Sequence, residues 1–162
     1  PQVNCLVGKK MSNVPVAEQW KTMVENLRYA AEALSLAGVK LLVEPLNSRD
    51  MPGFSLNTTA QVLEVLHEVG HDNAFLQYDV YHAQRMEGEL ADILRKNLAR
   101  ISHIQIADNT GRHQPGTGEI NYRWLLADFA ASGYAGYIGL EYIPLPDSAA
   151  SLAWVAEYGY SL

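Results

Sequence analysis

Four side chains with oxygen ligand atoms stand at similar places in the sequence, each at or near the end of a short apolar segment. Glu44 ends LLVE, Asp79 ends FLQYD, Gln105 lies within HIQIAD, and Glu141 follows IGL. Three carboxylates and one amide suit a hard divalent cation, since Mg²⁺ and Mn²⁺ prefer oxygen ligands. The set contains no Cys, so a structural zinc site is a poor fit. We therefore predict a site for Mg²⁺ or Mn²⁺, provided that the fold brings the four residues together.

Each of these residues also has an ordinary explanation. A single acid can cap the helix that follows it or pair with a neighbouring Lys or Arg, and it then carries no chemistry. The repetition at four segment ends favours the metal site over this explanation.

The segments that end in these residues are predicted β-strands. Five apolar segments rich in β-branched residues alternate with longer segments of helical periodicity, which is typical of parallel βα units. We expect strands near residues 3–7, 39–44, 74–79, 102–107 and 137–142. We expect helices near residues 16–37, from Asn57 or Thr58 to Gly70, over 87–98, from Asn121 to Gly133, and over 152–158. In parallel α/β folds the carboxyl ends of the strands form the ligand site, and the four residues fall there.

Five βα units fit two architectures, a complete doubly wound open sheet or five-eighths of a (β/α)8 TIM barrel. Strand alternation decides between them, because it places further polar groups on the same face as the four ligand candidates. The pairs are Leu42 with Glu44, Gln77 with Asp79, His103 with Gln105, and Gly139 with Glu141. In an open sheet covered by helices on both sides, these polar groups would be buried against apolar helix faces, which is unfavourable. The pattern favours a barrel, with residues 1–162 forming a single domain.

Composition limits the class of protein. The chain has 162 residues, of which 48% are hydrophobic, and it carries a net charge of −6, so we expect a globular domain that does not bind nucleic acid. The single Cys5 and the lack of an apolar run of membrane-spanning length point to a cytoplasmic protein with no membrane partner. The first residues enter a strand at once without an initiator Met, so we expect the chain to be part of a longer protein.

Longer motifs carry a family resemblance. The strings VNCLVGK, LLVEPLNSRDMPGF, LQYDVYHAQRMEG, ISHIQIADNTGRHQPGTGEINY and GLEY resemble the hydroxypyruvate isomerase family of the xylose-isomerase-like barrels. The resemblance implies that the chain holds strands four to eight of an eight-stranded barrel. It also implies that Glu44, Asp79, Gln105 and Glu141 bind the metal, that Glu44 and Glu141 donate and accept the proton, and that His82 contacts the substrate. One departure is Ile143, which stands before Pro144 where the family pattern has a Lys.

The activity implied by the resemblance is the interconversion of hydroxypyruvate and 2-hydroxy-3-oxopropanoate (tartronate semialdehyde) through an enediolate. One glutamate would move the proton while the cation stabilises the negative charge. Arg112 and His113, in the loop after Gln105, are candidates for binding the anionic substrate, although exposed loop residues of this kind often bind nothing.

Other functions stay open on the sequence alone. A ketose 3-epimerase or a related sugar isomerase could use the same two glutamates. An endonuclease-like metal enzyme fits poorly, because the net charge is negative and few histidines fall near the strand ends. A non-catalytic module that binds a sugar or small acid, or a flavodoxin-like domain, would lack converging ligands. Five of eight strands would also leave the first and last strands as open edges, so we expect a homo-oligomer.

Overall fold

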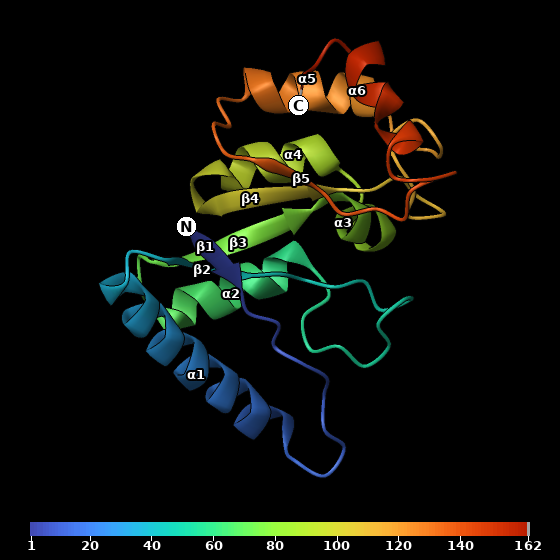
Figure 1. Ribbon diagram of the computed structural model, residues 1–162. Helices are drawn as coiled ribbons and strands as arrows, with labels where there is room; N and C mark the ends of the chain where they lie inside the picture. Colours follow the sequence, from blue (N-terminus) through green and yellow to red (C-terminus); the bar gives the residue numbers. More distant parts are fainter. Residues whose placement is uncertain (162) are drawn as a thin grey trace.

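The computed structural model describes residues 1–161, and its centre is a five-stranded parallel sheet (Figure 1). The strands are β1 (Gln2–Asn4), β2 (Lys40–Val43), β3 (Ala74–Asp79), β4 (Ile101–Ile106) and β5 (Ile138–Leu140). Each strand pairs with its neighbour in the sequence, in the order β1-β2-β3-β4-β5. A doubly wound sheet reverses its strand order, whereas a barrel does not. The structure therefore confirms the partial barrel and excludes the doubly wound alternative.

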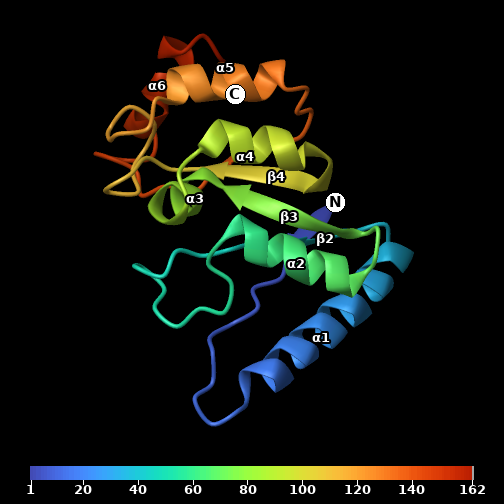
Figure 2. The same ribbon diagram turned by 180° about the vertical axis from the view of Figure 1, so that it is seen from behind.

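The helices cover one face of this sheet. They are α1 (Val16–Leu36), α2 (Thr59–Val69), α3 (Val80–Met86), α4 (Leu90–Asn97), α5 (Tyr122–Ala131) and α6 (Ala153–Glu157), with 3₁₀ turns at Leu98–Arg100 and Ala150–Leu152. In the view from behind, α2 is seen below β3 and α4 above β4 (Figure 2). The opposite face of the sheet is the face that would line the inside of a barrel.

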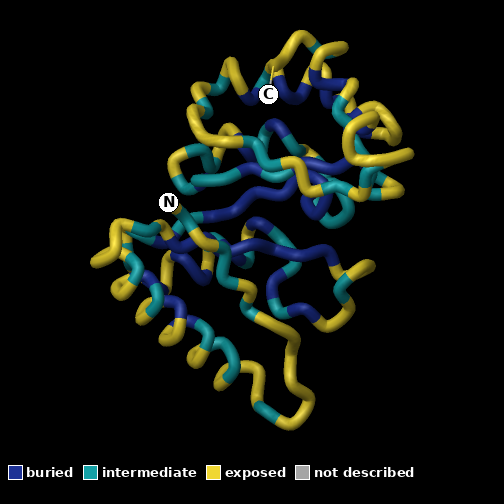
Figure 3. The backbone as a smooth tube through the Cα atoms, in the orientation of Figure 1, coloured by how far each residue is buried: buried dark blue, intermediate teal, exposed yellow. Residues whose placement is uncertain are grey.

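The core lies between the helices and the alternate strand residues that face them. Eight strand residues belong to the buried apolar cluster: Leu41, Val43, Ala74, Leu76, Tyr78, Ile101, Ile104 and Ile106. In the tube of Figure 3, β3 is buried along nearly all of its length, whereas β4 alternates between buried and intermediate residues. Residues one position away on each strand, such as Gln77 and Gln105, face the inside of the barrel and contact each other there. The period of two predicted from the sequence therefore separates an apolar outer face from a polar inner face.

Helix α2 has the boundaries that its sequence predicts. Thr58 is its N-cap, and together with Gln61 it forms a capping box. Gly70 ends the helix in the left-handed conformation, with φ 63°. Both termini are thus set by local residues.

We expect Thr58→Ala to lower the free energy of unfolding by about 1 kcal/mol, because the side-chain acceptor for the Gln61 N–H is lost. Urea denaturation followed by circular dichroism measures this change. Thr58→Ser keeps the hydroxyl and serves as the control, so an equal loss in both variants would contradict the capping explanation.

The helix expected over residues 87–98 is present as α4, which runs from Leu90 to Asn97. A further helix that the sequence did not predict, α3, precedes it and follows β3 without a loop. The chain turns between α3 and α4 at Gly88 and Glu89, both with positive φ (73° and 46°). Helix α3 was not predicted because no loop residues separate it from β3: Asp79 is both the last residue of the strand and the N-cap of the helix.

Strands β1 and β5 form the two edges of the sheet within the described residues, since β1 pairs with β2 and β5 with β4. Apolar side chains at these edges are accessible, with Val3 45% and Leu140 37% exposed. Among the helices of residues 1–161, none is long and apolar enough to cross a membrane.

We expect this chain to associate in solution, because unpaired N–H and C=O groups on an edge strand bind a further strand. Size-exclusion chromatography with light scattering should show a dimer or a larger species. Val3→Lys should reduce the association by placing a charge on the β1 edge. A stable monomer at all concentrations would contradict the expectation.

Candidate active site

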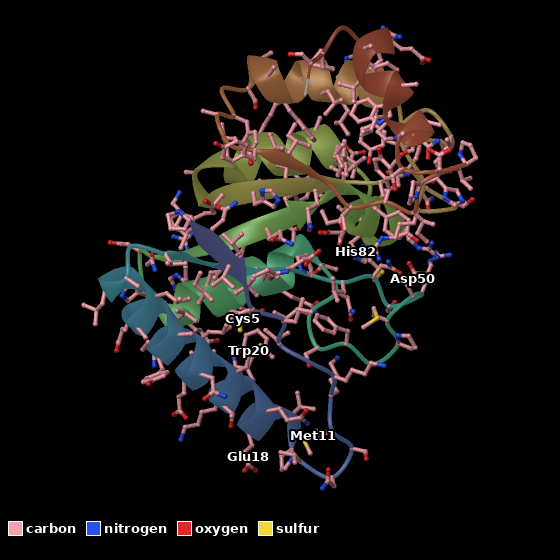
Figure 4. The ribbon with its side chains drawn as sticks, viewed as in Figure 1. Cys5, Met11, Glu18, Trp20, Asp50 and His82 are labelled. Carbon is pink, nitrogen blue, oxygen red and sulfur yellow. The ribbon has the colours of Figure 1, made fainter. Side chains whose placement is uncertain are left out.

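A pocket of about 280 Å³ opens at the carboxyl end of the sheet. Its polar lining residues come from all five βα units: Asn4, Glu44, Gln77, His82, Gln105, Arg112 and Glu141. Leu6, Leu46 and Met51 complete the wall. Figure 4 labels His82, which belongs to α3 and lies near Asp50.

Three of the four predicted metal ligands, Glu44, Gln105 and Glu141, line this pocket. The fourth, Asp79, is buried next to it, 3.9 Å from the pocket residue Arg112. Glu44 directly follows β2, Asp79 ends β3, Gln105 is the fifth residue of β4, and Glu141 directly follows β5. Asp79 pairs with Gln105 in the sheet register, and Gln105 pairs with Gly139 on β5. Parallel pairing without strand reversal therefore brings the four residues to the same rim.

Glu44 is held by two amide groups. Asn4 Nδ2 donates to Glu44 Oε2 over 2.6 Å, and Gln77 Nε2 donates to the same oxygen over 2.9 Å. Gln77 Nε2 also donates to Gln105 Oε1. The second carboxylate oxygen, Glu44 Oε1, is buried and has no hydrogen-bond partner among residues 1–161. This oxygen is free to bind a cation.

The two carboxylate oxygens of Asp79 have different surroundings. Its Oδ1 accepts a 2.8 Å hydrogen bond from the Tyr81 N–H and caps α3. Its Oδ2 is buried without a hydrogen-bond partner in the described part of the chain. It lies 3.6 Å from His82 Nε2 and 3.9 Å from Arg112 Nη2. The capping explanation thus accounts for one oxygen only.

Arg112 enters the pocket from the loop that follows β4. Its Nη2 lies 2.7 Å from Glu141 Oε2, and its guanidinium lies over the Tyr81 ring at 5.2 Å. The loop is anchored by buried Asp108, whose carboxylate accepts backbone hydrogen bonds from Gly116, Gly118 and Ile120. Glu141 therefore forms an ion pair with Arg112 in this structure, which is the non-catalytic explanation considered for a single acid in the sequence.

The structure does not bring His113 to the pocket. Its Nδ1 lies 2.7 Å from the Ile143 carbonyl oxygen, and the Ile143 N–H donates to the Arg112 carbonyl over 2.7 Å. These contacts join the loop after β4 to the loop after β5. At the position where the family pattern has a Lys, Ile143 contributes backbone contacts to this junction.

The pocket concentrates negative charge in a buried place. Burial, with the neighbouring charges of Asp79 and Glu141, raises the pKa of Glu44 to about 8. Burial and the charge of Glu141 also raise the pKa of Asp79 above its usual range. The pKa of His82 falls to about 4, because burial and the positive charge of Arg112 disfavour its protonated form.

These residues fit a divalent cation. Glu44 and Asp79 each present a buried oxygen without a partner in residues 1–161, and a cation would relieve the charge that raises their pKa values. Ligand atoms of Glu44, Asp79 and His82 lie within 4.8 Å of one another. The amide oxygen of Gln105 and the carboxylate of Glu141 line the same pocket.

Three polar residues of the site escaped the sequence analysis as functional groups. Asn4 and Gln77 hold Glu44, and Asn47 contacts His82. Gln77 could have been found from its place two residues before Asp79 on the same strand face. Asn47 lies in a loop, where the sequence has no periodicity to show its direction.

Comparison with known proteins agrees with the fold. Residues 1–158 match the family described as Xylose isomerase-like TIM barrel. The hydroxypyruvate isomerase of Escherichia coli (strain K12) is 46% identical over 97% of this chain, and the 2-oxo-tetronate isomerase of Cupriavidus necator is 44% identical over 97%. The chain spans 61% and 60% of the length of these two relatives.

A solved structure described as AP endonuclease, family 2 from Brucella melitensis superposes with a TM-score of 0.92 at 36% identity, covering 97% of this chain and 60% of that one. Since the family match extends over nearly all residues, the chain belongs to the xylose isomerase-like TIM barrel family.

Proposed function

We propose that this protein acts as an isomerase that interconverts hydroxypyruvate and 2-hydroxy-3-oxopropanoate with the help of Mg²⁺ or Mn²⁺. The observation that carries the proposal is the pocket itself. Glu44 lines it together with Gln105 and Glu141 and has a buried oxygen without a partner in residues 1–161. Asp79 has a second such oxygen next to the pocket, 3.6 Å from His82 and 3.9 Å from Arg112. The 46% identity to a hydroxypyruvate isomerase supports this choice of reaction.

The proposed metal ligands are Glu44, Asp79, Gln105 and Glu141. When bound, the cation supplies electrostatic stabilisation of the negative charge that develops on the substrate oxygens. Gln77 and Asn4 keep one oxygen of Glu44 occupied, so that its other oxygen faces the pocket. The protein thus prepares the ligand geometry before anything binds.

Proton transfer is assigned to Glu44 and Glu141. The reaction moves a carbonyl group by one carbon, so a base must remove a proton next to the carbonyl and an acid must return one to the neighbouring carbon. The two glutamates come from β2 and β5, with β3 and β4 between them. Glu44 is buried while the Glu141 side chain is 48% exposed, so the two carboxyl groups have different environments suited to two roles.

Arg112 and His82 are assigned to substrate binding. Both line the pocket, and a guanidinium group binds a carboxylate with two parallel hydrogen bonds. The ion pair between Arg112 and Glu141 would be exchanged for contacts with the substrate carboxylate.

We expect Arg112→Gln to change two affinities in opposite directions. Removing a positive charge 3.9 Å from Asp79 should tighten Mn²⁺ binding, whereas losing the carboxylate partner should raise KM. Isothermal titration with Mn²⁺ and steady-state kinetics measure the two effects. A parallel weakening of both would contradict these roles.

A second substrate has nearly equal support, since a 2-oxo-tetronate isomerase is 44% identical to this chain. That alternative keeps the same residues and reaction and extends the substrate by one carbon. Endonuclease activity, suggested by the name of the Brucella melitensis protein, is less compatible with the net charge of −6.

The test is a coupled assay with hydroxypyruvate, 2-oxo-tetronate and a ketose as substrates. It should be run on this chain and on a chimera in which the N-terminal part of the Escherichia coli relative precedes it. We expect turnover of hydroxypyruvate that chelator abolishes and Mn²⁺ restores. Preferred turnover of the ketose would favour an epimerase, and no turnover of any substrate in the chimera would refute the isomerase proposal.

A further inference from the structure

A buried asparagine outside the predicted ligand set, Asn47, contacts the His82 ring. The side-chain oxygen of Asn47 accepts hydrogen bonds from the backbone N–H groups of Arg49 and Asp50, over 3.1 and 2.9 Å. Its side-chain nitrogen donates to Asp50 Oδ2 over 3.0 Å. The two ends of the amide are thereby distinguished, because a flipped amide would place its oxygen against the Asp50 carboxylate.

With the amide orientation fixed, His82 Nδ1 faces two donors. The Asn47 backbone N–H lies 3.1 Å from Nδ1, and the Asn47 side-chain nitrogen lies 2.7 Å from it. A ring nitrogen that receives hydrogen bonds must carry a lone pair. The proton of the neutral imidazole is therefore on Nε2.

Further residues of α3 hold this arrangement in place. The Tyr81 hydroxyl donates to Asp50 Oδ2 over 2.7 Å, and Arg85 Nη1 donates to the Tyr81 hydroxyl over 2.7 Å. Arg85 Nη2 also lies 3.4 Å from Asp50 Oδ1. Because Tyr81 and Arg85 share a helix with His82, the loop that carries Asn47 and the ring it contacts are held together as one unit.

The protonated nitrogen of His82 faces the ligand side of the site, 3.6 Å from Asp79 Oδ2. An Nε2 that carries a proton has no lone pair for a metal ion. His82 belongs to the close cluster with Glu44 and Asp79, but in this tautomer it can only donate.

We propose that Asn47 is a positioning residue that holds His82 as the Nε2–H tautomer, so that His82 donates a hydrogen bond to a substrate oxygen and does not bind the metal. The hydrogen bond from His82 to a substrate oxygen rests on the proposed isomerase function. The tautomer is a property of this chain and can be measured without turnover.

The first test is the protonation pattern of the His82 ring by ¹⁵N NMR, with the signals assigned by their loss in His82→Gln. We expect a proton on Nε2 and none on Nδ1, both before and after addition of Mg²⁺. A proton on Nδ1 in the wild-type chain, or loss of the Nε2 proton when Mg²⁺ is added, would overturn the proposal.

The second test changes the donor. Asn47→Asp places a carboxylate acceptor beside His82 Nδ1, and we expect the proton to appear on Nδ1. Asn57→Asp is the matched control, because Asn57 donates to the Leu46 carbonyl of the same loop and not to His82. An unchanged His82 ring in Asn47→Asp would overturn the assigned role. If that variant does not fold, Asn47→Ala removes the side-chain donor and leaves only the backbone N–H of residue 47 at Nδ1. The fraction of Nδ1–H should then increase, and no increase would overturn the role assigned to the Asn47 side chain.

Kinetics separate this proposal from the proposed function. We expect Asn47→Asp to lower kcat/KM for hydroxypyruvate by about 10–100-fold, the range for groups that orient other site residues, while Asn57→Asp changes it little. Absence of turnover in the wild-type chimera would reject the isomerase function and leave the tautomer result standing. Normal turnover with the proton moved to Nδ1 would reject the positioning role alone.

Discussion

Glu44→Gln and Glu141→Gln are each expected to lower kcat by about 10²–10⁴-fold, because glutamine keeps the volume of the side chain and cannot transfer a proton. The measurement is the coupled assay with saturating hydroxypyruvate and Mn²⁺. Glu32→Gln, at an exposed position of α1, is the matched control and should keep full activity. Near-normal turnover in both site variants would reject the two catalytic roles.

The same Glu44→Gln variant has an expected signature in stability. The pKa of Glu44 in the folded chain is raised to about 8 from an ordinary value of 4.5, so the folded state keeps a proton that the unfolded state has lost. In chelator, the stability of the wild-type chain should therefore fall as the pH rises from about 4.5 to about 8. Glu44→Gln should lack this part of the fall. Thermal denaturation of both chains at several pH values measures this difference. It also shows whether Glu44→Gln, which should lose activity in the coupled assay, keeps its fold.

Mn²⁺ is expected to raise the free energy of unfolding by about 2.7 kcal/mol at a concentration one hundred times its Kd, since it binds the folded state. Asp79→Asn should remove most of this gain. Asparagine keeps an oxygen that can cap α3 but has no negative charge for the cation. Thermal denaturation with and without Mn²⁺, together with isothermal titration, gives both quantities.

The matched control for Asp79→Asn is Asp92→Asn on α4, where the carboxylate is 44% exposed and pairs with Lys96 over 2.7 Å. This variant should bind Mn²⁺ like the wild-type chain. Equal Mn²⁺ affinity in Asp79→Asn would mean that the pocket does not hold the cation through Asp79.

Much of the fold was predictable because each strand repeats one physical pattern. Apolar residues alternate along β3 and β4, and the polar residues between them fall on the opposite face, so the positions of Asp79 and Gln105 at the rim followed from period and chain order. The helix termini at Thr58 and Gly70 were equally readable, since capping depends on local residue types.

The remaining features depend on contacts between distant segments, which periodicity does not encode. Arg112 and His113 are adjacent in one loop, but Arg112 contacts Glu141 whereas His113 contacts Ile143. Which of the two side chains enters the pocket depends on where the chain after β5 runs, because Glu141 and Ile143 both lie there. The contact of Asn47 with His82 likewise joins two segments 35 residues apart.

The absence of a loop between β3 and α3 limits which changes of chain length the site can tolerate among related proteins. Asp79 ends the strand and caps the helix, so no residue can be inserted or deleted at this corner without moving its carboxylate. The segments between β2 and α2 and between β4 and α5 are long, and they carry Asn47 and Arg112. We therefore expect changes of loop length that alter substrate preference to accumulate in those two segments, while the β3–α3 corner keeps a constant length.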